Sequence, residues 1–121
     1  METIKSNTFQ TGDNVAVHKM EQDLVGGVEL DMTGLETAYA ANADFIPDGT
    51  PIIDTAGVYS PLTAATLVAD GPKVVGFLFQ SIPVSAPHAS VAIRGTVNEA
   101  RLPFAIDAAV KTAVKGAISF I

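Results

Sequence analysis

The distribution of apolar residues changes near Phe45, and this break limits what the chain can fold into more than any other feature. Residues 1–44 are polar and acidic without a sustained hydrophobic period, whereas residues 45–121 are dense in apolar segments. A core forms where apolar side chains recur on one face of an element. The sequence therefore predicts an extended N-terminal arm over residues 1–44, at least partly disordered when free, and a compact domain over residues 45–121.

The charge follows the same division of the chain. Residues 1–50 carry nine acids and two bases (net −7), and residues 51–121 carry four acids and five bases (net +1). An acidic chain is repelled by nucleic-acid phosphates and by anionic lipid headgroups, so we expect neither nucleic acid nor a membrane as a partner. The sequence has no cysteine, so it has no disulfide framework, and residues 1–13 lack the basic-then-apolar pattern of a secretory signal.

Local signals in residues 45–121 predict a small, mostly β domain of the α+β class. Two apolar segments, Pro51–Asp54 and Val58–Leu62, flank a turn that contains Gly57, and this pattern is typical of a β-hairpin. The segment Lys73–Phe79 is apolar on both faces, which indicates a central buried strand. Gly76 inside that strand predicts a bulge or a close approach of a neighbouring backbone.

The last third of the chain predicts a strand, a helix and a final strand. Ser90–Glu99 reads as a strand with one face in water, and its apolar face is expected to carry Val91, Ile93 and Val97. Residues 103–115 have apolar residues at i, i+3, i+4 and i+7, the period of one short helix near the C-terminus. Residues 117–121 are apolar again and are expected to join a sheet.

One short segment of the arm has the period of a strand. Val28, Leu30 and Met32 alternate with polar or acidic residues directly after two glycines. A strand this short is not stable alone in water, so it needs a sheet to join. Two partners remain open at this point, the sheet of its own domain and the sheet of another protein to which it adds as a strand.

The sequence shows no arrangement of residues that indicates catalysis. His18 and His88 have no neighbours at metal-ligand spacing, and the serines near His88 lack a recognisable base and oxyanion hole. Glu29 and Asp31 share one face of the short strand, where charges discourage indiscriminate pairing. We therefore expect a structural or binding protein rather than an enzyme, with no catalytic residue, no cofactor and no metal.

Four motifs together resemble a known family. They are Pro-Asp-Gly-Thr-Pro-Ile at 47–52, Asp-Gly-Pro-Lys-Val-Val-Gly-Phe-Leu-Phe at 70–79, Gly-Thr-Val-Asn-Glu-Ala-Arg-Leu-Pro at 95–103 and Ala-Ile-Ser-Phe-Ile at 117–121. In this order, behind a polar arm, the chain resembles the head decoration proteins of tailed bacteriophages, the lambda-type capsid-stabilising family. The resemblance covers residues 45–121.

The resemblance implies a function and a set of contacts. It implies a homotrimer, made in the host cytoplasm, that binds the outer capsid surface of the virion and clamps neighbouring copies of the major capsid protein. The arm would order on the capsid by strand addition, with Val28, Leu30 and Met32 as the capsid-binding residues. Residues that become candidates for the trimer interface are Phe77, Phe79, Leu102 and Pro103.

A second function class is a small β-rich module that binds a receptor or a glycan on a virion surface. Glycan sites usually use exposed aromatic side chains, and the chain has no tryptophan and only two tyrosines, Tyr39 and Tyr59. The sequence therefore favours the decoration function over this alternative.

Overall fold

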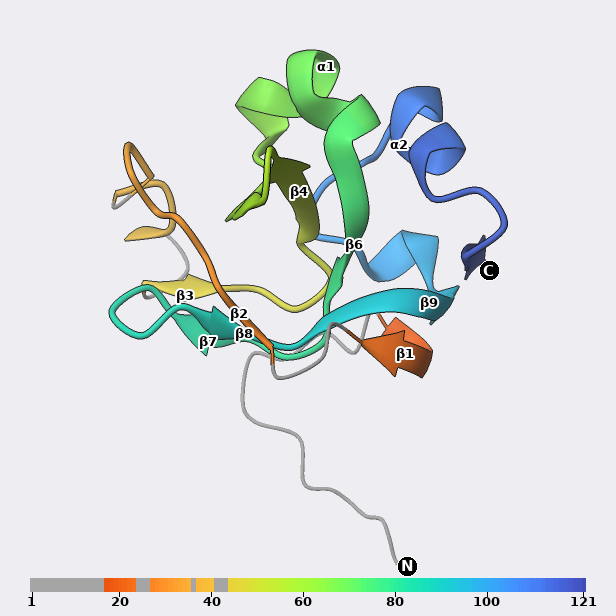
Figure 1. The fold of residues 1–121 in the computed structure, drawn as a ribbon, viewed down its shortest axis with the longest axis horizontal. Coiled ribbons are helices and arrows are strands. Elements are labelled where there is room, and N and C mark those ends of the chain that lie inside the picture. The colour runs from red at the N-terminus through yellow and green to blue at the C-terminus, as the bar shows by residue number, and fades with distance from the viewer. Residues whose placement is uncertain (1–16, 24–26, 36, 41–43) are drawn as a thin grey trace, which may run out of the picture.

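The computed structural model describes residues 17–23, 27–35, 37–40 and 44–121, and residues 1–16 of the expected arm lie outside it. The fold is small and mostly β with a short helix near the C-terminus, which confirms the predicted α+β class. Its main sheet has the strand order β1-β9-β6-β4-β5, with β10 also paired to β9 (Figure 1). The strands of this sheet are β1 (Val17–Asp23), β4 (Pro51–Thr55), β5 (Val58–Pro61), β6 (Val74–Leu78), β9 (Val91–Val97) and β10 (Ile118–Phe120).

Two small antiparallel pairs lie at the end of the molecule opposite the C-terminus (Figure 1). They are formed by β2 (Val28–Glu29) with β8 (His88–Ala89) and by β3 (Phe45–Ile46) with β7 (Ile82–Pro83). Short helical segments fill the remaining connections, namely η3 (Ala64–Thr66), α1 (Leu67–Asp70), η4 (Gly71–Lys73), η5 (Glu99–Arg101) and α2 (Ala108–Ala113).

The hairpin of β4 and β5 forms as predicted, and its turn explains why. Ala56 and Gly57 both have positive φ, 53° and 90°, which matches the two-residue turn that suits the twist of antiparallel strands. The backbone amide of Gly57 also donates to the Asp54 carboxylate at 2.8 Å. The turn therefore fixes the register in which Thr55 pairs with Val58.

Strand β6 is central, as its two-sided hydrophobicity predicted, and Gly76 allows its close packing. β6 lies between β4 and β9 in the sheet. A Cβ atom at Gly76 would stand 2.4 Å from the carbonyl oxygen of Ala92 on β9, a distance that no side chain tolerates. The predicted close approach of a neighbouring backbone is therefore confirmed.

The sheet separates two hydrophobic cores, because successive side chains of a strand point to opposite faces. Ile53, Phe77 and Ala92 belong to the first core. Ile52, Leu78 and Val91, each next to one of them in the chain, belong to the second. The buried residues of the first core are Val17, Ile53, Leu62, Val74, Phe77, Ala92, Val97, Val110, Val114 and Ile118. Those of the second core are Leu30, Met32, Tyr39, Ile46, Ile52, Leu78, Ala89 and Val91.

The apolar face predicted for β9 is wrong in one respect. Val91 packs in the second core, whereas Val97 packs in the first, so these two residues do not share a face. Between them the register of β1 against β9 shifts, and Ile93 is the extra residue that β9 carries opposite Gln22 and Asp23. An irregularity of this kind adds a residue to one strand and inverts the alternation beyond it.

The C-terminal helix is shorter than the sequence predicted. α2 begins at Ala108 instead of Pro103 because Asp107 caps it: the backbone there is extended, and the carboxylate accepts a hydrogen bond from the Val110 amide at 3.3 Å. Capping by Asp satisfies an amide that would otherwise lack a partner at the helix start. Val110 and Val114 are buried as the predicted stripe requires.

The boundary expected at Phe45 does not separate an arm from the domain among the described residues. β1 pairs antiparallel with β9 along the edge of the main sheet, and Val17 is buried in the first core. Leu30, Met32 and Tyr39 contribute to the second core. Residues 17–23 and 27–40, where they are described, therefore belong to the same folded unit as residues 45–121.

We predict that Gly76→Ala destabilises the protein by at least about 2 kcal/mol, because the added methyl meets a backbone oxygen that moves only if β9 moves. Chemical denaturation followed by circular dichroism measures the free energy of unfolding. Val75→Ala, at a half-buried position of the same strand, is the matched control and should cost less. Equal stabilities of Gly76→Ala and the wild type would contradict the role of Gly76.

Candidate functional site

The segment expected to bind a capsid by strand addition is paired within its own chain. β2 pairs with β8, the Leu30 amide donates to the Pro87 carbonyl at 2.9 Å, and the Asp31 amide donates to the Tyr59 carbonyl at 2.8 Å. The side chains of Leu30 and Met32 are only 3% and 9% exposed. Of the two alternatives left open by the sequence, the structure has the one in which the segment joins its own domain, so these two side chains are not available to another protein.

The four candidates for the trimer interface do not form one surface. Phe77 is fully buried, so it is a core residue. Its ring packs edge-on against that of Phe120, with 5.8 Å between the ring centres. Phe79 and Pro103 are exposed, and Leu102 is half-buried. β6 runs antiparallel to β9, so Phe79, which follows β6, lies near the start of β9. Leu102 and Pro103 come after the end of β9, at the opposite end of that strand.

A shallow groove of about 500 Å³ lies beside the inward-packed segment. The Asp31 carboxylate at this groove accepts hydrogen bonds from the amide and the hydroxyl of Thr33, at 3.0 and 2.6 Å. These bonds hold the pKa of Asp31 below its usual value, so the groove carries a fixed negative charge at neutral pH. The residues that line it are Glu29, Leu30, Asp31, Met32, Thr33, Val84 and Pro87.

The structure shows where the serine and histidine residues considered for catalysis or metal binding lie. The Ser81 hydroxyl accepts a hydrogen bond from the Asp48 amide at 3.1 Å, which fixes the loop before β4. His88 is exposed on β8, while the side chain of His18 is outside the described part of the structure. Within the described residues, no three potential ligands gather in a way that would hold a metal ion. The helices described are also all too short to cross a bilayer.

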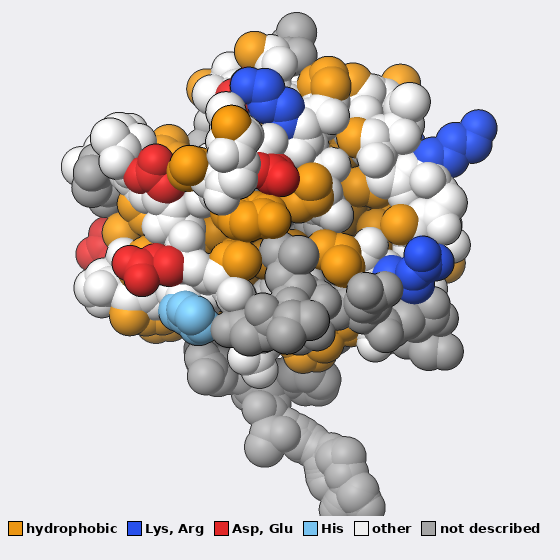
Figure 2. Space-filling model, viewed as in Figure 1, with side chains coloured by type: hydrophobic (Ala, Val, Ile, Leu, Met, Phe, Trp, Pro, Cys, Tyr) orange, Lys and Arg blue, Asp and Glu red, His pale blue; other side chains and the backbone are white. Residues whose placement is uncertain are grey.

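Four large apolar side chains are exposed in the described part of the chain, and sequence reasoning singled out only one of them. They are Phe45, Val58, Phe79 and Ile121, with exposures of 41%, 50%, 37% and 63%. Phe45 served in the sequence only as a boundary, and Val58 only as part of a hairpin. The front of the molecule shows apolar side chains between the charged groups (Figure 2). Exposed apolar side chains mark a surface for protein contact where they gather into a patch, whereas single ones are common on any protein surface.

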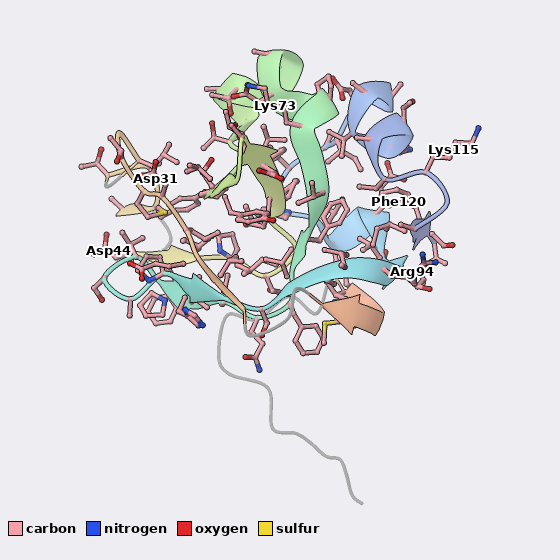
Figure 3. All side chains as sticks on the ribbon, in the orientation of Figure 1. Asp31, Asp44, Lys73, Arg94, Lys115 and Phe120 are labelled. Atoms are coloured by element: carbon pink, nitrogen blue, oxygen red, sulfur yellow. The ribbon has the colours of Figure 1, made fainter. Side chains whose placement is uncertain are left out.

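Charged side chains are separated along the long axis of the molecule. Asp31 and Asp44 lie at one end, whereas Arg94, Lys115 and Phe120 lie at the other (Figure 3). Both acids and both bases have exposed side chains. Among these labelled residues, exposed acids and exposed bases therefore lie at opposite ends of the described structure.

No protein-family model matches the sequence, and no curated protein matches it. The functional interpretation therefore depends on the residues themselves and on where the fold places them.

A buried tyrosine in the second core gives a prediction of pH dependence. The Tyr39 hydroxyl has no hydrogen-bond partner among the described residues, and burial raises the pKa of Tyr39 to about 12. In the unfolded chain this group ionises near the ordinary pKa of a tyrosine, 10.0. Folding stability that depends on the neutral hydroxyl is therefore complete below pH 10 and is lost as the pH rises from 10 through about 12.

We predict that Tyr39→Phe unfolds with a free energy equal to or above that of the wild type at pH 7, because it removes an unsatisfied buried hydroxyl. Between pH 10 and 12 the wild type should lose more stability than the variant. Urea denaturation at several pH values measures both. A variant that is markedly less stable at pH 7 would indicate that the hydroxyl has a partner.

Proposed function

We propose that this protein is a structural virion component that binds the outside of an expanded bacteriophage head as a homotrimer. In this function it stabilises the shell by clamping neighbouring major capsid proteins, and it performs no catalysis. One observation carries the proposal: the four motifs that resemble the lambda-type decoration family join one another in the fold. Their contacts join the four motifs into a single structural unit.

The first two motifs are joined by backbone hydrogen bonds. The Gly49 amide donates to the Leu78 carbonyl at 2.7 Å, and the Leu78 amide donates to the Thr50 carbonyl at 2.9 Å. The last two motifs are joined in the same way, because β10 lies parallel to β9 with Ile118 opposite Gly95. Pairing of β6 with β9 then links the two halves. These contacts support a common architecture for the stretch that carries the resemblance.

The proposed capsid contact lies in the part of the arm that precedes β1. The described residues between 17 and 40 are committed to the sheet and the second core. Residues 1–16 are the rest of the arm before β1 and lie outside the described residues. Strand addition by this segment is the proposed mode of attachment. Three such arms on one trimer would bind together at a high effective concentration, so each arm need bind only weakly.

The alternative function, a glycan- or receptor-binding module, has less support. Tyr39, one of the two tyrosines, is 7% exposed and is part of the second core, so it cannot stack on a sugar ring. Tyr59, on β5 of the hairpin, is half-buried and packs against the same core.

Binding to shells tests the proposal directly. We expect the purified protein to cosediment with expanded heads of its own phage and to raise their resistance to heat or chelation, because it bridges neighbouring capsid proteins. Unexpanded shells are the matched control, since their subunits are arranged differently. Equal failure to bind both kinds of shell would contradict the proposed function.

Two truncations separate attachment from folding. A variant lacking residues 1–16 should keep the melting temperature of the full chain, because every described contact is retained. It should lose shell binding, because the proposed attachment segment is removed. A variant lacking residues 1–33 should unfold, because it loses β1 and removes Leu30 and Met32 from the second core. Shell binding that survives the shorter deletion would place the capsid contact elsewhere.

A further inference from the structure

The two ends of the long axis carry opposite charge and one exposed apolar residue each. At the acidic end, Asp44 precedes Phe45, which is 41% exposed on β3. At the basic end, Ile121 follows β10 and is 63% exposed. Figure 1 places β3 and the C-terminus on opposite sides of the molecule. The acidic end therefore combines an exposed apolar side chain with exposed acids. The basic end combines one with the exposed Arg94 and Lys115, beside a Lys111–Glu99 ion pair whose charges cancel.

The fold fixes some of the groups at these ends and leaves other charged side chains exposed. Asp44 lies in a turn with a φ of 61°, and its carbonyl accepts a hydrogen bond from Val84 at 2.9 Å. At the basic end, Lys111 pairs with Glu99 at 2.9 Å and lies 5.9 Å from the centre of the Phe120 ring. Arg94 and Lys115 take no part in this ion pair. The backbone at Asp44 is fixed in this way before contact, so it loses little freedom on association.

The acidic and basic ends of one molecule cannot meet, because they lie at opposite ends of its longest axis (Figure 3). They can meet between two copies of the chain. A contact between two different patches of the same protein is heterologous, and it closes into a ring when the rotation between copies allows it. A ring of three copies uses both ends of every copy and leaves neither charge exposed without its complement.

We propose that the acidic end of one protomer, formed by Asp31, Asp44 and Phe45, docks on the basic end of the next, formed by Arg94, Lys115 and Ile121. The occupant of each end is thus a second copy of this chain, chosen by charge complementarity. The inference rests on the proposed homotrimer and specifies which surfaces build it. It replaces Phe77, which is buried, as an interface residue.

Four proteins test this arrangement by sedimentation velocity over a range of concentrations. They are the wild type, the basic-end variant Arg94→Glu/Lys115→Glu, the acidic-end variant Asp31→Lys/Asp44→Lys, and the variant with all four changes. The molar mass obtained for the wild type should be three times the 12.5 kDa of one chain. Each two-residue variant should dissociate at concentrations at least about tenfold higher than the wild type, because like charges then face each other.

The four-residue variant is the decisive protein, because it has the net charge of the wild type with both ends exchanged. If the ends meet, its opposite charges face each other again and the trimer returns. A matched control is Lys73→Glu, which reverses an exposed charge away from both ends (Figure 3). It breaks only the local ion pair with Asp70, at 3.3 Å, and should leave the mass unchanged. Raising the salt concentration should weaken the wild-type trimer and should spare a trimer held by apolar contacts alone.

Folding of the lysine variants is checked separately, because Asp31 accepts hydrogen bonds from Thr33 and Asp44 has a positive φ. Asp31→Asn/Asp44→Asn removes both charges while keeping a side chain that tolerates these turns, and it should also weaken the trimer. A folded end variant with the wild-type mass, or a folded four-residue variant that stays dissociated, would overturn the inference and leave the proposed function standing. A wild type that is monomeric at every concentration would instead overturn the homotrimer itself.

Discussion

The pairing of β9 with three other strands is the interaction on which the rest of the structure depends. β9 pairs antiparallel with β1 and β6 and parallel with β10, so the beginning, middle and end of the described chain meet on one strand. It also contributes to both cores, through Ala92 on one face and Val91 on the other. Such a small domain buries little surface per residue, so its stability depends on sharing central elements in this way.

The elements that the sequence predicted correctly are those specified by local signals. The hairpin of β4 and β5 is set by its turn residues, and β6 by a run that is apolar on both faces. The region of β1 was assigned to the extended arm because its stabilisation is non-local: it depends on β9, more than 65 residues later in the chain. The start of α2 was misplaced because the hydrophobic stripe continues beyond the helix, whereas the side chain of Asp107 decides where it begins.

The candidate contact residues show the same limit. The alternation of Val28, Leu30 and Met32 correctly indicated one apolar face, but alternation does not say which sheet that face covers. The fold supplies the answer in the second core, where Leu30 and Met32 pack beside Ala89. For Phe77 the sequence held two incompatible expectations, a place in a buried central strand and a place in an interface. A strand with neighbours on both edges and cores on both faces leaves no side exposed, so the first expectation excludes the second.

The folding of residues 27–35 and 44 into the domain changes the physical meaning of the charge asymmetry. A charged arm that is free samples many positions, and it must lose that freedom on binding before any attraction counts. Asp31 and Asp44 are instead held by the fold, across the molecule from Arg94 and Lys115. Fixed opposite charges act as a permanent dipole that orients an approaching copy, which speeds association and disfavours contacts between like ends. An assembly built from such units is therefore directional: each copy presents a different end to each neighbour, and the same surface cannot pair with itself.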